Sequence, residues 1–230
     1  MNLISRRSWV GLLFSLLLST SLQVSSDSLS EGAHLYKAGQ YQKALSAWEK
    51  AAENGSAEAK YNIANMYYFG KGVEKNKELA ALWYQRAASD GHAASQFFAA
   101  EQLYHGDGVS MDRKKAVNYL RQAAENGFTK AQTNLANIYL SGVGVPQNYS
   151  EAVKWYKSAA QQGDADAQYN LSNMYAQGLG VEEDYVFAYV LASLSAAQGN
   201  ESAKFNREII ANLLTPEQLE TAQQIAASLY

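Results

Sequence analysis

The sequence contains no cysteine and only two prolines among its 230 residues. The absence of cysteine excludes disulfide bonds and thiolate metal sites, so side-chain packing must stabilise the fold. The net charge of −3 and the scattered basic residues argue against a broad nucleic-acid-binding surface, which requires clustered lysine and arginine. Both prolines, Pro146 and Pro216, lie at expected turns or helix starts, so the rest of the chain is compatible with helix throughout.

Histidine is also rare, and its distribution does not favour metal binding. His34, His92 and His105 lie in different parts of the chain, no two of them are four residues apart, and His105 with Asp107 alone is a weak pattern. The many serines and carboxylates show no spacing that selects a nucleophile and its base. We therefore expect no catalytic residue, no metal site and no cofactor.

The N-terminus has the pattern of an export signal. Arg6 and Arg7 precede an apolar stretch over residues 9–18, and a serine-rich segment follows. The apolar stretch is shorter than the roughly 20 residues that span a bilayer. We expect residues 1–26 to be a signal peptide cleaved after Ser26, with an uncleaved anchor as the alternative. The mature protein would then be periplasmic or secreted, in a Gram-negative bacterium, without a stable membrane span.

Identical residues recur every 36 positions along most of the chain. One glycine column consists of Gly55, Gly91, Gly127, Gly163 and Gly199. A second glycine column consists of Gly70, Gly106, Gly142 and Gly178, each followed two residues later by another glycine. This regularity defines four repeats, 57–92, 93–128, 129–164 and 165–200.

Each repeat has the pattern of two helices. In the third repeat, Ala131, Leu135, Ala136 and Tyr139 share one helical face of the segment TKAQTNLANIYL. The segment SEAVKWYKSAAQQ shows a second apolar stripe, and a glycine follows each segment, as is typical of helix ends. We therefore expect an all-α fold.

The glycine-rich connection SGVGVPQNY, residues 141–149, raises the possibility of a phosphate-binding loop. Such a loop requires a lysine followed by serine or threonine after the glycines, and a preceding strand, and neither is present. The position before the second helix is always a good N-cap residue. That column consists of Asn76, Asp112, Asn148 and Asp184. The connection is therefore interpreted as a helix end, a short turn and a helix start.

Shorter elements flank the four repeats. Residues 27–56 are predicted to form an N-terminal capping hairpin similar to a tetratricopeptide repeat, because Ala44 and Ala52 keep the register of the repeats. Residues 201–230 are predicted to form a C-terminal capping helix pair. Thr215 and Gln218 have the spacing of a capping box, and Pro216 occupies the first helical position.

The segments AQYNLSNMYAQGLGV, residues 167–181, and EAVKWYKSAAQQGDADAQ, residues 151–168, resemble the Sel1-like repeat. This resemblance implies a right-handed α-solenoid of antiparallel helix pairs, close to the tetratricopeptide superhelix. It also implies a role as an adaptor that binds other proteins, often in the bacterial envelope or outside the cell. A cysteine-rich branch of the family is associated with weak β-lactamase-like activity. This chain lacks those cysteines and a Ser-x-x-Lys motif, so we do not expect that activity here.

The first helix of each repeat carries a largely polar stripe, and in helical solenoids the first helices line the concave surface. The predicted partner-binding residues on this stripe are Asn62, Asn65, Phe69, Phe98, Glu101, His105, Asn134, Asn137, Asn170, Asn173 and Gln177. A ladder of carboxamides can donate and accept hydrogen bonds, which suits an extended peptide backbone. The alternative is that the asparagines only hold neighbouring repeats together.

The second repeat departs from this pattern. Phe98 and Glu101 stand where the other repeats have asparagine, and His105 occupies the end of the same helix. Departures from a repeat consensus invite a functional interpretation. We interpret Phe98, Glu101 and His105 as a specificity patch with Phe98 as its apolar anchor, against the alternative of neutral drift in one repeat.

Together these patterns predict a non-enzymatic scaffold of the cell envelope that binds a partner protein or peptide on a concave face. Three alternatives remain at this point. They are a β-lactamase-like envelope hydrolase, a structural component of an envelope motor or secretion assembly, and a secreted factor that binds host proteins.

Overall fold

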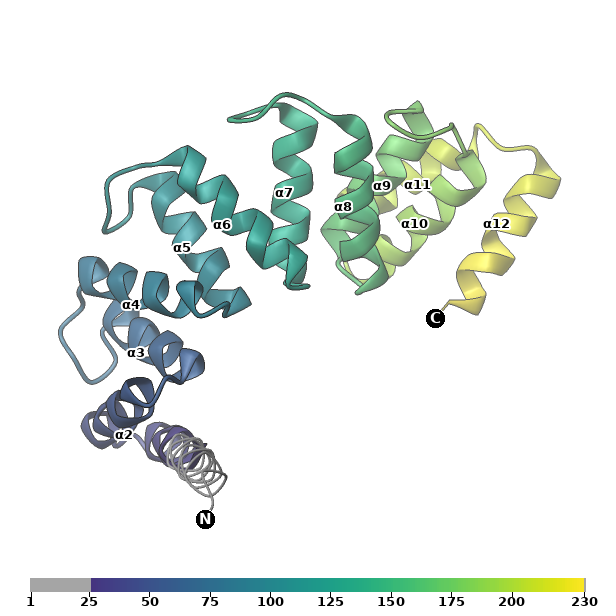
Figure 1. Cartoon of the computed structure of the whole chain (residues 1–230). Coiled ribbons are helices and arrows are strands. Elements are labelled where there is room, and N and C mark those ends of the chain that lie inside the picture. Colours follow the sequence, from purple (N-terminus) through teal and green to yellow (C-terminus); the bar gives the residue numbers. More distant parts are fainter. Residues whose placement is uncertain (1–25, 230) are drawn as a thin grey trace, which may run out of the picture. The chain divides into compact units, whose positions relative to one another are not determined.

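The computed structural model describes residues 26–229, and this part of the chain contains helices and no strand (Figure 1). The predicted signal peptide, residues 1–26, lies outside the described residues except for Ser26. A first helix covers residues 26–37. The helices that follow are α2 (Tyr41–Glu53), α3 (Ala57–Phe69), α4 (Lys77–Ser89), α5 (Ala93–His105), α6 (Arg113–Glu125), α7 (Thr129–Ser141), α8 (Tyr149–Gln161), α9 (Ala165–Gln177), α10 (Tyr185–Ala197), α11 (Glu201–Ala211) and α12 (Pro216–Ser228). The predicted all-α repeat fold is confirmed.

The helices recur with the period of the sequence. Helices α3, α5, α7 and α9 begin at residues 57, 93, 129 and 165. The chain divides into two compact units, the first ending at Asp112 and the second beginning at Arg113. The first unit contains α2 to α5, and the second contains α6 to α12. Among the described residues, every helix is too short or too polar to cross a membrane.

Alanine at the helix interfaces allows neighbouring helices to approach closely. In the first unit, Ala44, Ala51 and Ala59 are fully buried in one apolar cluster with Ile63. In the second unit, a corresponding cluster gathers buried residues of α10, α11 and α12. Because each pair of helices packs mainly on its sequence neighbours, stability is roughly a sum of nearest-neighbour terms.

The two glycines of each connection have different roles. The first glycine ends the first helix in a left-handed conformation, as at Gly178, whose φ is 63° and whose N–H donates to the Met174 carbonyl oxygen. At Gly72, Gly108 and Gly180 the second glycine lies close to the preceding helix pair, whereas Gly144 does not. A Cβ atom on Gly180 would lie 2.4 Å from the carbonyl carbon of Tyr149, at the start of α8. At these three connections the turn thus packs directly on the start of the preceding second helix.

Three of the four predicted N-cap residues form their capping hydrogen bonds. The side chains of Asn76, Asn148 and Asp184 accept hydrogen bonds from backbone N–H groups in the first turns of α4, α8 and α10. Thr215 and Gln218 form the predicted capping box, with Pro216 at the start of α12. The glycine-rich connections are therefore helix boundaries.

Three buried glutamines, which the sequence analysis did not single out, join successive repeats. Each glutamine lies on a first helix and donates through Nε2 to a backbone carbonyl oxygen of the preceding second helix. The bonds join Gln96 to Ala88 at 3.2 Å, Gln132 to Ala124 at 3.1 Å and Gln168 to Ala160 at 3.4 Å. We call these contacts the glutamine braces.

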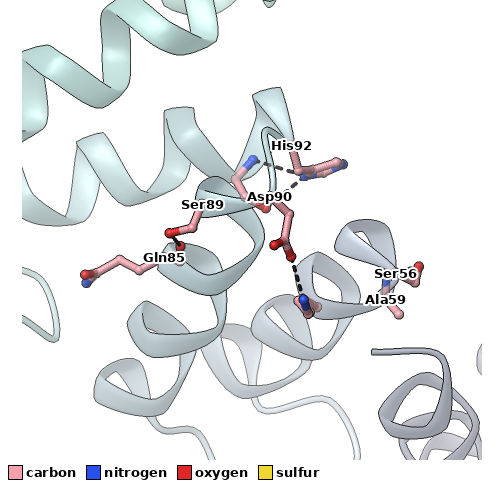
Figure 2. Close-up of polar contacts among 8 residues, drawn as sticks. Ser56, Ala59, Gln85, Ser89, Asp90 and His92 are labelled. Carbon is pink, nitrogen blue, oxygen red and sulfur yellow. Dashed lines mark hydrogen bonds and ion pairs between the residues drawn. The ribbon is translucent and has the colours of Figure 1, made fainter. Parts of the chain in front are cut away.

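In the third and fourth repeats, the side chain that follows the second helix completes this contact. Gln162 donates to Oε1 of Gln132 at 2.7 Å, and Gln198 donates to Oε1 of Gln168 at 2.8 Å. In the first repeat, an ion pair of 2.5 Å between Lys60 and Asp90 takes the equivalent place. Figure 2 shows Asp90 in this pair beside the N-cap residue His92. The same two positions therefore tie the helix pair together by amides or by opposite charges.

A matched pair of glycine substitutions tests the close approach between repeats. Gly180 and Gly144 both have positive φ, but a Cβ atom on Gly144 would meet no atom within 4 Å. We expect Gly180→Ala to lower the free energy of unfolding by about 1–3 kcal/mol more than Gly144→Ala, because only the former introduces a clash. Chemical denaturation of both variants measures this difference. Equal losses would show that the contact at Gly180 is unimportant for stability.

Candidate functional site

In the first unit, four of the predicted binding residues line one hollow. Asn62, Asn65 and Phe69 of α3 face this space with Phe98 of α5. We call it the asparagine hollow; its volume is about 610 Å³. The remaining lining residues are Ala33, Tyr36, Lys37, Trp48, Glu58 and Tyr61. The polar stripe predicted on first helices is thus part of a real concavity in this unit.

A second pocket adjoins the hollow through Phe98, which lines both. We call this space the Gln102 pocket; its volume is about 410 Å³. The pocket is lined by Tyr68, Tyr84, Phe98, Glu101, Gln102, His105, Gly106 and Asp107. The three residues of the predicted specificity patch, Phe98, Glu101 and His105, therefore share one pocket.

Aromatic rings form the wall where the two spaces meet. Phe98 stacks on Tyr84 with ring centroids 5.3 Å apart, and Tyr61 lies 6.0 Å from each of these rings. Tyr68 contacts the edge of Phe69 at 5.0 Å. Phe69 itself is 60% exposed, which leaves a large apolar surface available at the rim of the hollow. Apolar walls with a few polar groups are typical of ligand sites.

The asparagines of the ladder are only partly used within their own repeats. The Tyr84 hydroxyl donates to Oδ1 of Asn65 at 2.6 Å, and the Tyr156 hydroxyl donates to Oδ1 of Asn137 at 2.5 Å. Within residues 26–229, the Nδ2 atoms of these two asparagines have no hydrogen-bond partner, and neither does the carboxamide of Asn62. Asn65 and Asn137 therefore brace the helix pair through their oxygens, while their Nδ2 groups have no partner among residues 26–229.

In the second unit the predicted residues are more dispersed. Asn134 and Asn170 are half-buried on α7 and α9, and Gln177 is exposed at the end of α9. Asn173 accepts a hydrogen bond from Asn206, so it links α9 to α11. An apolar pocket of about 470 Å³ in this unit is lined by other residues of α8, α9 and α10, together with Leu229.

Charged groups surround the Gln102 pocket. Lys77 and Asp107 form an ion pair of 2.5 Å. The hydrogen bond between them raises the pKa of Lys77 and lowers the pKa of Asp107. The Tyr68 hydroxyl donates to the same carboxylate at 3.1 Å. Burial, followed by that hydrogen bond, raises the pKa of Tyr68. Glu101 and His105 lie 3.9 Å apart on one face of α5. Both carboxylates of the lining, Glu101 and Asp107, therefore lie next to a basic side chain.

Gln102 has the least expected environment in the pocket. Its side chain is 4% exposed, and both carboxamide atoms lack a hydrogen-bond partner among the described residues. The equivalent positions in the other repeats are apolar, namely Met66, Ile138 and Met174. An unpaired buried amide costs about 1–3 kcal/mol. The sequence signal for this residue is a polar exception in an apolar column, outside the polar stripe of the first helices.

The described residues contain no group of three or more histidine, aspartate or glutamate side chains placed to hold a metal ion.

The comparisons with known proteins agree with the geometry. A family model described as "Sel1 repeat" matches residues 29–56, 57–92, 93–128, 129–164 and 165–200. The first hairpin therefore also matches the repeat. A Sel1 repeat protein from Oxalobacter formigenes is 34% identical, with a TM-score of 0.74, over 78% of this chain and 74% of that one. No curated protein matches the sequence.

A second solved structure covers more of this chain. It is c5321, described as a protective antigen present in uropathogenic Escherichia coli strains and displaying an SLR fold. It is 35% identical, with a TM-score of 0.75, and the match covers 92% of this chain. This chain spans 47% of the length of c5321, about half of that protein.

The same change, glutamine to methionine, at Gln102 and at Gln132 tests whether the Gln102 carboxamide is unpaired. We expect Gln102→Met to raise the free energy of unfolding by about 1 kcal/mol or more, because it removes an unpaired buried amide. Gln132→Met is the matched control, since Gln132 is similarly buried but belongs to a glutamine brace. It should lower stability by about 1–3 kcal/mol. Denaturation of both variants measures the two signs, and a loss of stability in Gln102→Met would contradict the assignment.

His92, the N-cap residue of α5, is expected to make the stability of the fold depend on pH. Nδ1 of His92 accepts from the Ser95 N–H at 3.3 Å, and the ring lies 4.9 Å from Tyr61. Burial lowers the pKa of His92 below 6.5, although Glu58 partly opposes this. As the pH falls, the unfolded chain takes up the proton first, so the folded state loses stability below about pH 6.5.

Asparagine at this position would cap the helix without titrating. We therefore expect the difference in unfolding free energy between His92→Asn and the wild type to grow in favour of the variant between pH 8 and pH 5.5. Urea denaturation at the two pH values measures it. A difference that stays constant with pH would exclude His92 as the titrating group.

Proposed function

The chain belongs to the Sel1 repeat family, and on that premise we propose that it is a scaffold that binds an extended segment of a partner protein along α3 and α5 of its first unit. Sel1 repeat proteins are generally protein-interaction scaffolds. One observation carries the proposal. Six predicted binding residues line two adjoining spaces: Asn62, Asn65, Phe69, Phe98, Glu101 and His105.

The chemistry of the asparagine hollow suits a polypeptide backbone. The Asn62 carboxamide and Nδ2 of Asn65 have no partner within the described part of the chain, so they can bond successive peptide groups. The exposed ring of Phe69 provides apolar contact for a side chain of the ligand. Several modest contacts of this kind, with a few dominant side chains, are typical of protein interfaces.

We further propose that binding is the whole activity and that it takes place outside the cytoplasm. The sequence has neither the cysteines of the β-lactamase-like branch nor a Ser-x-x-Lys motif. Residues 1–26 have the pattern of a cleaved signal, which supports export to the periplasm or beyond. The similarity to c5321, a bacterial antigen, is consistent with exposure outside the cell.

A photo-crosslinking experiment tests the proposed surface. The photoreactive residue p-benzoylphenylalanine replaces Phe69, and the protein is irradiated in the envelope fraction of its own organism. We expect a discrete cross-linked partner, identified by mass spectrometry. Changing Phe98 and Glu101 together to Asn should reduce its yield at least about tenfold, because an apolar anchor and a charge are lost. Asparagine at these columns is already present in other repeats, so the fold should persist.

A chemically matched control uses the outer surface of α4. Leu82 is exposed, as is Glu78 four residues earlier, and neither lines the two spaces. Changing both to asparagine removes the same kinds of group without touching the site. The proposal fails if the Phe98 and Glu101 variant, folded by circular dichroism, cross-links the partner as well as this control does.

A further inference from the structure

The apolar pocket of the second unit shares no residue with the two spaces of the first unit. We propose that this space, which we call the α10 pocket, binds an aliphatic chain with a carboxylate head, as in a free medium-chain fatty acid. Three observations support the assignment: a largely apolar lining, one cation in it that has no ion pair within the described chain, and apolar side chains on α10 at positions that are polar in the preceding repeat. The inference does not depend on the proposed function.

The apolar part of the lining is long enough for an aliphatic chain. Helix α10 contributes Phe187, Val190, Leu191 and Leu194, and Leu229 adds to it from the end of α12. Phe187 and Leu194 are seven residues apart, which is about 10 Å along a helix axis. An extended chain of about eight carbons has a similar length. The volume of about 470 Å³ lies in the range of small-molecule sites, and each methylene removed from water favours binding by about 0.8 kcal/mol.

The apolar surface of α10 is a departure from the preceding repeat. Phe187, Val190 and Leu194 lie at positions where the side chains of the third repeat are polar. The equivalent residues there are Glu151, Lys154 and Ser158. The last helices account for part of this change, since Val190 is buried in one cluster with Ile210 and Ala222. Phe187 is nevertheless 39% exposed, so its ring remains open to a ligand.

A cation lies beside the exposed ring. Of the described residues that line the pocket, only Lys157 of α8 is charged. Its Nζ lies 5.3 Å from the centroid of the Tyr175 ring, which makes an edge contact with Phe187 at 4.8 Å between centroids. Lys157 forms no ion pair with any residue of 26–229, whereas Lys154 on the same helix lies 3.6 Å from Glu151. A ligand carboxylate near Phe187 would therefore meet a cation that has no other anionic partner.

The polar groups of the lining suit an aliphatic chain better than a peptide backbone. The carboxamide of Gln168 is already engaged, because its Nε2 donates to the Ala160 carbonyl oxygen and its Oε1 accepts from Gln198. The other carboxamide of the lining is that of Gln161, at the exposed end of α8. A peptide presents an N–H and a carbonyl group at almost every residue, and each requires a partner when it leaves water. An aliphatic chain has no such requirement.

Eight-carbon amphiphiles with different head groups test the α10 pocket directly. The probes are octanoate, octanol and octylammonium, and binding to the full chain at neutral pH is followed by NMR of leucine and valine methyl groups. Signals that also change in Phe187→Gln are assigned to the pocket. We expect octanoate to shift them with a Kd on the order of 1 mM. Octanol should bind about threefold more weakly, and octylammonium at least about tenfold more weakly, because it brings two cations together.

A fourth probe tests the alternative occupant. N-acetyl-leucine carries a carboxylate and a short apolar side chain, as the last residue of a peptide does. We expect it to bind more weakly than octanoate, because its amide must leave water without gaining a partner. If it binds as tightly as octanoate, the pocket recognises a peptide end and the fatty-acid assignment is wrong.

Two lysine variants of α8 separate a specific charge from the net charge of the protein. Lys157→Met should reduce the affinity for octanoate about threefold, to that of octanol, and leave octanol binding unchanged. Lys154→Met is the matched control, since Lys154 lies on the same helix but outside the lining. It should leave both probes unchanged. Equal effects of the two variants on octanoate, or no effect of Lys157→Met, would overturn the assignment of the carboxylate.

Two apolar variants test the place of the chain. Phe187 and Ile225 are similarly exposed, at 39% and 41%, but only Phe187 lines the pocket. Both Phe187→Gln and Ile225→Gln are therefore expected to fold. Phe187→Gln should weaken octanoate and octanol about tenfold each, because the chain loses an apolar wall, whereas Ile225→Gln should weaken neither. Octanoate binding that is equally strong in the two variants would show that the α10 pocket is not its site.

Discussion

The contact between the turn of one repeat and the second helix of the repeat before it constrains the rest of the structure. A Cβ atom at Gly180 would overlap the backbone at Tyr149, and a Cβ atom at Gly108 would lie 2.4 Å from the Lys77 carbonyl oxygen. At these two connections the turn after a first helix lies against the start of the second helix before it, which is the same pair of helices that the glutamine braces of Gln96 and Gln168 join. The positions of Phe98 and Gln102 on α5 follow from the same geometry, so the candidate site is a product of the stacking.

The features that were predictable from the sequence are local. N-caps such as Asn148, the capping box at Thr215 and the left-handed glycines depend on residues within one turn of the chain, so their spacing is sufficient to identify them. The polar stripe was also predictable, because helical periodicity places Asn62, Asn65 and Phe69 on one face. In the first unit, the predicted residues of both repeats reach common spaces.

The features that were not predictable depend on contacts between helices. The role of Gln132 becomes visible only when Ala124 and Gln162 are seen beside it. Similarly, Asn65 could not be assigned to bracing or binding until the Tyr84 hydroxyl was found on its oxygen. The sequence held a clue, because tyrosine occurs at the Tyr84 position in the first and third repeats, whereas the second has leucine and the fourth alanine. Asn65 and Asn137 are the asparagines that meet such a tyrosine.

The glutamine braces also make the array modular. Each brace joins a residue to a carbonyl eight positions earlier, and Ala88, Ala124 and Ala160 are equivalent acceptors one period apart. Excision of residues 93–128 would therefore place Gln132 against Ala88 in the geometry that Gln96 now has. Recombination between repeats in the gene could shorten or extend the protein by whole copies without creating a new kind of junction. The same event would delete Phe98, Glu101 and Gln102 together, so the residues of the candidate site would be lost or gained as one repeat rather than one at a time.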